Sequence, residues 1–132
     1  MGCGLISTEQ TAISTIQEHS LGQLIQPLIR EIYLYHTYVA GTSYVKEQSR
    51  FIDLGPGDEL ILKREPDNEH DDRAILVLNN RKEKLGYVPR AENIVFSRLM
   101  DAGKILKAKV REKDLSEYGY WEMEMEIFLV DL

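Results

Sequence analysis

The residue types with the most potential for chemistry are concentrated in one polar segment, REPDNEHDDRAI, at positions 64–75. Pro66 restricts the residue before it to an extended conformation, and the Asp-Asn pair after it supplies turn chemistry. The three carboxylates and the imidazole at positions 69–72 exceed what a turn needs. Their mutual repulsion disfavours a compact loop unless a hydroxyl, a cation or backbone N–H groups take up the charge. The segment therefore indicates either a binding site or a loop whose Asp and Asn side chains cap their own backbone.

A hard divalent cation is one ligand for such a segment, because Mg²⁺ and Ca²⁺ take oxygen ligands. The candidate ligands are Glu65, Asp67, Asn68, Glu69, His70 and Asp71. EF-hand spacing is absent, and no second carboxylate cluster completes a two-metal nuclease site. A Walker-type phosphate loop, an HExxH motif and a nucleophile elbow are absent as well. Metal-dependent hydrolysis is therefore the weakest functional hypothesis, and we predict no catalytic residue, no bound metal and no cofactor.

Aromatic residues at turn and loop positions provide a second kind of chemistry. Tyr44 follows a Gly-Thr-Ser turn, and Tyr87 follows Gly86 on a short expected strand. Three further rings lie in or beside a loop near the C-terminus: Tyr118, Tyr120 and Trp121. Exposed rings near the mouth of a β-barrel stack on nucleic-acid bases, whereas rings that cover the core bind no ligand. The sequence leaves both interpretations open.

The elements that must position these residues are mainly strands. Alternating β-branched and aromatic residues, or short apolar runs, predict four strands before the last third of the chain, at positions 32–39, 59–64, 75–78 and 84–88. A helix is expected to begin at Pro89, which suits a first helical position, and to stop before Gly103.

The first 30 residues are expected to form a helical extension. Residues 7–10, STEQ, have the form of a capping box, and apolar residues then recur at roughly helical spacing over positions 13–28. An apolar stripe of this length must pack on the domain or on a partner. We therefore divide the chain into an N-terminal helical extension, residues 1–30, and a β-barrel domain, residues 31–132.

The last third of the chain predicts a two-stranded hairpin. Apolar and charged residues alternate in both segments, 106–111 and 121–127, and the charges are basic in the first and acidic in the second. A loop centred near residues 116–117 would pair Arg111 with Glu122, Lys109 with Glu124 and Lys107 with Glu126. The three cations would then be partly neutralised, so we do not assign them to a nucleic-acid surface.

The properties of the whole chain limit the class of protein. Its 132 residues suffice for one domain with a buried core. A net charge of −6 argues against a protein that coats nucleic acid by electrostatics alone, although the acidic excess is concentrated in residues 112–132. The single Cys3 cannot form an internal disulfide, and no stretch approaches the ~20 apolar residues of a membrane span. We expect a cytoplasmic protein that does not bind membranes.

Four segments, taken in order, resemble the HIRAN domain: VAGTSY (39–44), GDEL (57–60), REPDNEHDDRAI (64–75) and LGYVP (85–89) with the helix after it. The resemblance covers residues from about Val39 to Ile127. The combination of EPDN, the Asp and Ala-Ile that follow it, and Gly-Tyr-Val-Pro is specific. The resemblance implies a mainly β, α+β fold, namely a small OB-like β-barrel with peripheral helices, here in a stand-alone member of the family.

The resemblance also implies a function. HIRAN domains are usually attached to DNA-remodelling translocases of replication-fork DNA repair, where they capture the 3′ end of single-stranded DNA and are not catalysts themselves. The binding positions of the family correspond here to Tyr44, Asn68, His70, Asp71, Tyr87 and Arg90. Asp71 matters most, because a carboxylate accepts a hydrogen bond from a free 3′-hydroxyl and repels a 3′-phosphate. His70 replaces a Tyr of the family, and an imidazole can still stack and, when protonated, add a positive charge.

Three hypotheses result. The first is a non-catalytic nucleic-acid-binding module for single-stranded DNA 3′ ends. The second is a protein-interaction or assembly domain that has lost DNA binding, which is favoured by the acidic tail and by Ser43, where DNA-binding members carry Arg. The third is the metal-dependent hydrolase. Two stacked bases at ~1–3 kcal/mol each give one copy only about millimolar affinity, so the first hypothesis includes a homo-oligomer or protein partner bound through the N-terminal helices.

Overall fold

The computed structural model describes residues 29–131. The expected N-terminal helices lie outside these residues, and the division of the chain at residue 30 stays a prediction. Within the described range, six strands form one sheet of order β1-β6-β5-β2-β3-β4. The strands are β1 (Arg30–Tyr38), β2 (Glu59–Arg64), β3 (Ile75–Leu78), β4 (Lys84–Tyr87), β5 (Ile105–Leu115) and β6 (Trp121–Asp131). The helical elements are the 3₁₀ turns η2 (Thr42–Tyr44) and η3 (Gln48–Phe51) and the helix α3 (Asn93–Asp101).

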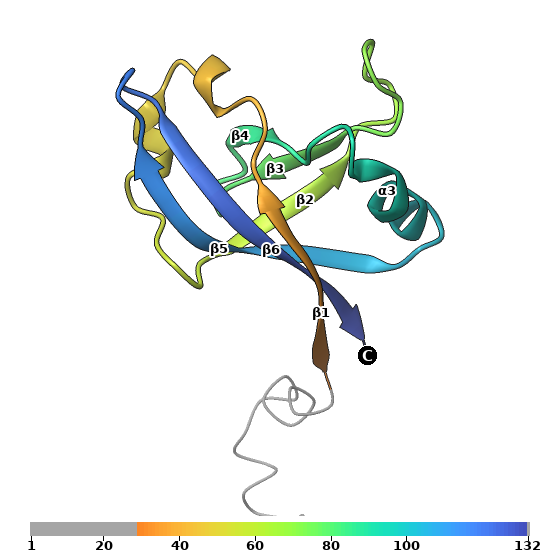
Figure 1. The fold of residues 1–132 in the computed structure, drawn as a ribbon. Coiled ribbons are helices and arrows are strands. Elements are labelled where there is room, and N and C mark those ends of the chain that lie inside the picture. The colour runs from red at the N-terminus through yellow and green to blue at the C-terminus, as the bar shows by residue number, and fades with distance from the viewer. Residues whose placement is uncertain (1–28, 132) are drawn as a thin grey trace, which may run out of the picture. The chain divides into compact units, whose positions relative to one another are not determined.

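The sheet curls so that the segment following one edge strand, β1, reaches the other edge strand, β4, at one point (Figure 1). Ala40, two residues beyond β1, exchanges two backbone hydrogen bonds with Tyr87 of β4, at 2.8 and 2.9 Å. Gly86 permits this approach, because a Cβ atom at that position would lie 2.3 Å from the Ala40 carbonyl oxygen. The sheet is therefore joined by a bridge at this point and not by a complete ladder.

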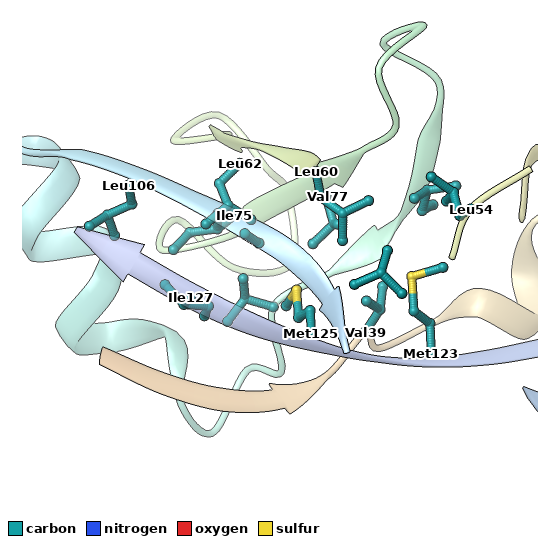
Figure 2. Close-up of a cluster of buried hydrophobic side chains, with 14 of the residues drawn as sticks. Val39, Leu54, Leu60, Leu62, Ile75, Val77, Leu106, Met123, Met125 and Ile127 are labelled. Atoms are coloured by element: carbon teal, nitrogen blue, oxygen red, sulfur yellow. The ribbon is translucent and has the colours of Figure 1, made fainter. Parts of the chain in front are cut away.

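Alternation along the strands builds the core. Side chains from β2, β3, β5 and β6 point toward one another between the two halves of the curled sheet (Figure 2). The most completely buried apolar residues are Phe51, Leu60, Ile75, Val77, Leu85, Val88, Ala108, Val110, Met123, Met125 and Ile127. Phe96 of α3 adds to this core from the side of the helix. Strands β2, β3 and β4 all contribute residues to this core, and the polar segment connects β2 to β3.

The helix α3 begins later than predicted. Pro89 does not start it, because Pro89 to Glu92 form a separate turn in which the Glu92 N–H donates to the Pro89 carbonyl at 2.9 Å. The helix then runs from Asn93 to Asp101. This turn moves the first helical residue, Asn93, to the polar loop, where it becomes part of the candidate site.

The predicted hairpin of β5 and β6 is present, but its predicted register is wrong by two residues. Lys109 lies opposite Glu126, and Val110 lies opposite Met125. The turn spans residues 116–120, where Gly119 has a φ of 88°, and an irregularity follows Val110. The longer turn and the irregularity together shift the pairing, whereas the predicted apolar side chains of both segments still face the core.

Of the three cations predicted to be neutralised, Lys107 and Lys109 form salt bridges, but with partners on other strands. The predicted pair of Arg111 with Glu122 is wrong, because Glu122 lies opposite Asp114. Lys107 forms salt bridges with Glu31 of β1 at 2.5 Å and with Glu59 of β2 at 2.8 Å. Lys109 contacts Glu31 at 2.7 Å. These hydrogen bonds lower the pKa of Glu31 below its usual value. The lysines thus bind neighbouring strands together instead of forming a basic surface.

The predicted fold class is confirmed. The described residues form a mostly antiparallel sheet with one α-helix, which is a small OB-like β fold. Strands β2 and β3 have the predicted bounds, and β1 and β4 differ from them by one or two residues. In residues 29–131, no helix has the length and apolar character needed to cross a membrane.

Candidate nucleic-acid interface

The loop between β2 and β3 is held in place by Arg64, the last residue of β2. Its guanidinium donates to the backbone carbonyls of Asp72 and Ala74 at 2.9 and 2.8 Å. It also forms a two-pronged ion pair with Asp101 at the end of α3, at 2.9 and 3.1 Å. The loop therefore projects beside α3 (Figure 1). One cation fixes the strand, the loop and the helix to one another.

Asn68 organises the interior of the loop. Its Oδ1 accepts the backbone N–H groups of His70 and Asp71 at 2.9 and 3.0 Å, and its Nδ2 donates to Glu65 at 2.8 Å. This is the Asx-type capping that the sequence offered as one interpretation of the segment. The Asn68 side chain also lines a surface hollow, so capping leaves it within reach of a ligand.

Asp71 connects the loop to the helix α3. Its Oδ1 accepts the backbone N–H of Arg73 at 3.0 Å, and its Oδ2 accepts Nδ2 of Asn93 at 2.8 Å. Arg90 approaches the same Oδ2 at 4.0 Å. Burial alone would raise the pKa of Asp71, but these hydrogen bonds and the charges of Arg90 and Arg73 hold it below its usual value. The carboxylate is thus ionised near neutral pH, with its side chain 11% exposed.

Glu65 and Tyr87 form a second hydrogen-bonded pair, which Asn68 connects to the interior of the loop. The Tyr87 hydroxyl donates to Glu65 at 2.8 Å. The hydrogen bonds from Asn68 and Tyr87 lower the pKa of Glu65 below its usual value. Burial and the contact with Glu65 raise the pKa of Tyr87, so its hydroxyl stays protonated. The ring of Tyr87 is thereby fixed by its hydroxyl at one end and by the bridge to Ala40 at the other.

Two neighbouring hollows lie against Tyr87 in the described part of the molecule. The Asp71 hollow, of about 360 Å³, is lined by Ala40, Asn68, His70, Asp71, Ala74, Lys84, Tyr87, Val88, Arg90 and Asn93. The Tyr44 hollow, of about 370 Å³, is lined by Gly41, Tyr44, Val45, Lys46, Glu47, Arg50, Lys84 and Tyr87. Lys84 and Tyr87 line both, so the hollows form one continuous surface across the point where the sheet closes.

The structure brings the predicted site residues together on this surface. The Asp71 hollow contains five of them: Asn68, His70, Asp71, Tyr87 and Arg90. Tyr44 lies in the second hollow, on η2, and its side chain is 88% exposed. A ring this exposed, beside the fixed ring of Tyr87, is able to stack on a planar ligand.

Asn93 and Lys84 are among the residues of this surface that were not predicted from the sequence. Asn93 is 1% exposed, donates to Asp71, and has an Oδ1 with no hydrogen-bond partner within residues 29–131. Lys84 places its ammonium group 4.6 Å from the centre of the Tyr87 ring. Lys84 was detectable, because it precedes the Leu-Gly-Tyr motif, whereas Asn93 reaches the loop only through the turn that delays α3.

Charge is distributed unevenly over the molecule. Among the described residues that line the two hollows, four are cations, Lys46, Arg50, Lys84 and Arg90, and two are carboxylates, Glu47 and Asp71. A third hollow nearby is lined by four carboxylates instead, Glu112, Asp114, Glu122 and Glu124. The linings of these two hollows therefore contain more cations than carboxylates, although the whole chain has a net charge of −6.

The metal hypothesis gains no geometric support. Over residues 29–131, no three His, Cys, Asp or Glu side chains gather in an arrangement suited to a metal ion. The oxygens of Asp71, Asn68 and Glu65 are instead engaged with N–H and O–H donors of the protein.

Comparisons with known proteins agree with this geometry. The family model of the HIRAN domain matches residues 32–127. A crystal structure of a protein from Lactobacillus plantarum is 28% identical, covers 79% of this chain and 99% of its own, and has a TM-score of 0.72. The HIRAN domain of human HLTF shares the fold, with 17% identity, a TM-score of 0.60, and coverage of 77% of this chain and 78% of its own. No curated protein sequence matches the chain. The chain belongs to the HIRAN domain family, a family of nucleic-acid-binding modules.

Proposed function

We propose that this protein is a non-catalytic module that binds the 3′ end of single-stranded DNA on the surface formed by the two hollows. The observation that carries the proposal is the composition of that surface. Its described lining residues include four cations and two carboxylates, although the chain as a whole has a charge of −6. A polyanion is thus attracted to this surface and repelled by the rest of the molecule.

The chemistry of the Asp71 hollow suits a strand end that carries a hydroxyl. Asp71 is a deprotonated acceptor whose two oxygens take one hydrogen bond each from Arg73 and Asn93. A carboxylate has about four lone-pair positions, so it retains capacity for a further donor. Asn93 orients this carboxylate through its Nδ2 and lines the same hollow. A terminal hydroxyl supplies a donor, whereas a terminal phosphate brings only acceptors and negative charge.

Stacking supplies the remaining affinity. Tyr44 and Tyr87 offer one exposed and one fixed ring, and base stacking contributes ~1–3 kcal/mol per base. The resulting affinity of one copy is about millimolar, so we propose a second copy or a protein partner, bound through residues 1–30, that raises the effective concentration. A chain whose only cysteine is Cys3 suits a reducing compartment, and we assign the cytoplasm.

A titration of short single strands tests this function. The strands are identical except for a 3′-hydroxyl, a 3′-phosphate or a 3′-deoxy end, and binding is followed by NMR chemical-shift changes, which report millimolar affinities. We expect the 3′-hydroxyl strand to bind about tenfold more tightly than the 3′-phosphate strand, which corresponds to ~1.4 kcal/mol. The largest shifts are expected at Tyr44, Asp71 and Tyr87.

Asp71→Asn should reduce that preference, because the amide no longer repels a phosphate. Asp72→Asn is the matched control, since Asp72 lies in the same loop, is exposed, and is not part of either hollow. Equal binding of all three strands by the natural protein would remove end recognition. Absence of binding would remove the nucleic-acid function and leave the assembly domain as the better hypothesis.

A further inference from the structure

We infer that Lys84 binds the phosphate that links the last two nucleotides of the strand and so fixes which nucleotide enters which hollow. This inference rests on the proposed function. It concerns a residue that the sequence did not single out. The argument comes from the position of Lys84, from its contacts and from the chemistry of the groups around it.

Lys84 lies at the boundary between the two hollows. It is the first residue of β4 and the only charged residue common to both linings among the described residues. The other residue that the linings share is Tyr87, whose ring carries no charge. A strand with its terminal nucleoside in the Asp71 hollow and its next base on Tyr44 must carry the linking phosphate across this boundary. The cation that the phosphate meets there is Lys84.

The contacts of Lys84 place its ammonium group over Tyr87 without a direct ion pair, although its charge helps to lower the pKa of Glu65 from a longer distance. The Nζ atom lies over the Tyr87 ring, 4.6 Å from its centre, in a cation–π contact. Within residues 29–131, Nζ forms no salt bridge. The neighbouring arginines either form an ion pair or lie away from the boundary between the hollows. Arg50 donates to Glu47 and to the Lys84 carbonyl, and Arg90 lies near Asp71.

Substitution of the Lys84 side chain should leave β4 intact, because the hydrogen bonds of this residue are made by its backbone and the side chain contributes a cation–π contact with Tyr87. Its carbonyl accepts Nη1 of Arg50 at 2.9 Å, and its backbone pairs with Leu78 of β3. The side chain itself is exposed. Lys84→Gln therefore removes a charge from the binding surface while it preserves β4, which the thermal unfolding midpoint verifies.

The test compares strands in which one linkage is a methylphosphonate, an uncharged replacement for phosphate. In the natural protein, we expect replacement of the last linkage at the 3′ end to weaken binding several-fold, and replacement of the first linkage at the 5′ end of a longer strand to have a smaller effect. In Lys84→Gln, replacement of the last linkage should have almost no further effect, because the two changes remove the same contact. Lys104→Gln is the control, since Lys104 lies outside both hollows.

Salt dependence gives a second readout. For a single strand, the logarithm of the binding constant falls with the logarithm of the salt concentration, and each phosphate contact contributes about 0.7 to the steepness of this line. Lys84→Gln should therefore make the line less steep by ~0.7. The preference for a 3′-hydroxyl over a 3′-phosphate should persist, because Asp71 determines it. If the last-linkage effect is the same in Lys84→Gln as in the natural protein, the inference is wrong while end recognition stands. If the natural protein binds no strand, both are wrong.

Discussion

At the scale of single residues, Asp71 combines a structural role with the proposed recognition role. Its carboxylate joins the backbone of the loop to Asn93 of α3, and the residue also lines the hollow. The structural hydrogen bonds also make recognition possible, because they keep a poorly exposed carboxylate ionised. An acceptor that is charged, oriented and still unsaturated is well suited to a hydroxyl group. Asn93 adds to this orientation because it is almost completely buried.

Glu65 predicts how the stability of the loop depends on pH. Hydrogen bonds from Asn68 and Tyr87 hold its pKa below the usual 4.5 in the folded protein. A lowered pKa means that the folded state favours the ionised form, so the stabilisation is complete above about pH 4.5 and is lost as the pH falls through the folded-state pKa. At pH 7, we expect the free energy of unfolding to be larger for the natural protein than for Glu65→Gln. This difference in free energy should shrink below pH 4.5.

Urea unfolding of both proteins from pH 7 to pH 3 measures this difference. Glu69→Gln is the control, because Glu69 is an exposed residue of the same loop. A difference between the natural protein and Glu65→Gln that stays constant over the whole pH range would contradict the proposed role of the Glu65 carboxylate.

At the scale of elements, the site depends on the point where the sheet closes. Ala40 lines the Asp71 hollow, and its bridge partner Tyr87 lines both hollows. A residue with a side chain at Gly86 would prevent this contact, since its Cβ would lie 2.3 Å from the Ala40 carbonyl oxygen and 2.7 Å from Cγ1 of Val39. The glycine of the Leu-Gly-Tyr motif is thus required by the architecture that places Tyr87, and not by any ligand contact of its own.

Gly86→Ala should therefore open the closure. Overpacking of a close contact lowers stability by ~1–3 kcal/mol, and we expect a loss of free energy of unfolding in this range. Hydrogen exchange should locate the damage, because the amides of Ala40 and Tyr87 lose their mutual hydrogen bonds. Gly55→Ala is the control, because a Cβ atom added at Gly55 would meet no residue beyond its chain neighbours within 4 Å. Unchanged protection of the Ala40 and Tyr87 amides would show that the bridge does not depend on Gly86.

Elements also show which features of this molecule are readable from its sequence. The bounds of β2 and β3 follow from apolar runs and turn residues, because both signals are local. The register of β5 with β6 does not follow from such local signals, because an irregularity after Val110 and a five-residue turn shift it by two residues. The loop residues of the site were recognised by their types, whereas Asn93 was not, because a tertiary contact with Asp71 defines its role.

At the scale of the whole molecule, the separation of charge gives the proposed ligand a preferred direction. The acidic hollow, lined by Glu112, Asp114, Glu122 and Glu124, shares Gly41 with the Tyr44 hollow. Register places Glu112 opposite Glu124 and Asp114 opposite Glu122, so like charges face each other across the hairpin. In the proposed complex, we expect a strand that leaves Tyr44 to be repelled from this side and directed toward the cations that line the two binding hollows.

Neutralisation of this acidic surface should therefore strengthen the binding of a single strand. The gain should appear at low salt, where the repulsion between the carboxylates and the strand is not screened. For the double variant Glu122→Gln and Glu124→Gln, we expect several-fold tighter binding of a single strand at ~10 mM salt, where the screening length is about 30 Å. The gain should narrow at ~150 mM salt, where that length is about 8 Å, because the charges lie outside the binding hollows and act through solvent. The control variant, Glu122→Asp with Glu124→Asp, keeps both charges and should bind as the natural protein does. A gain that is independent of salt would mean that these side chains contact the strand directly, and the acidic surface would then belong to the binding site instead of bounding it.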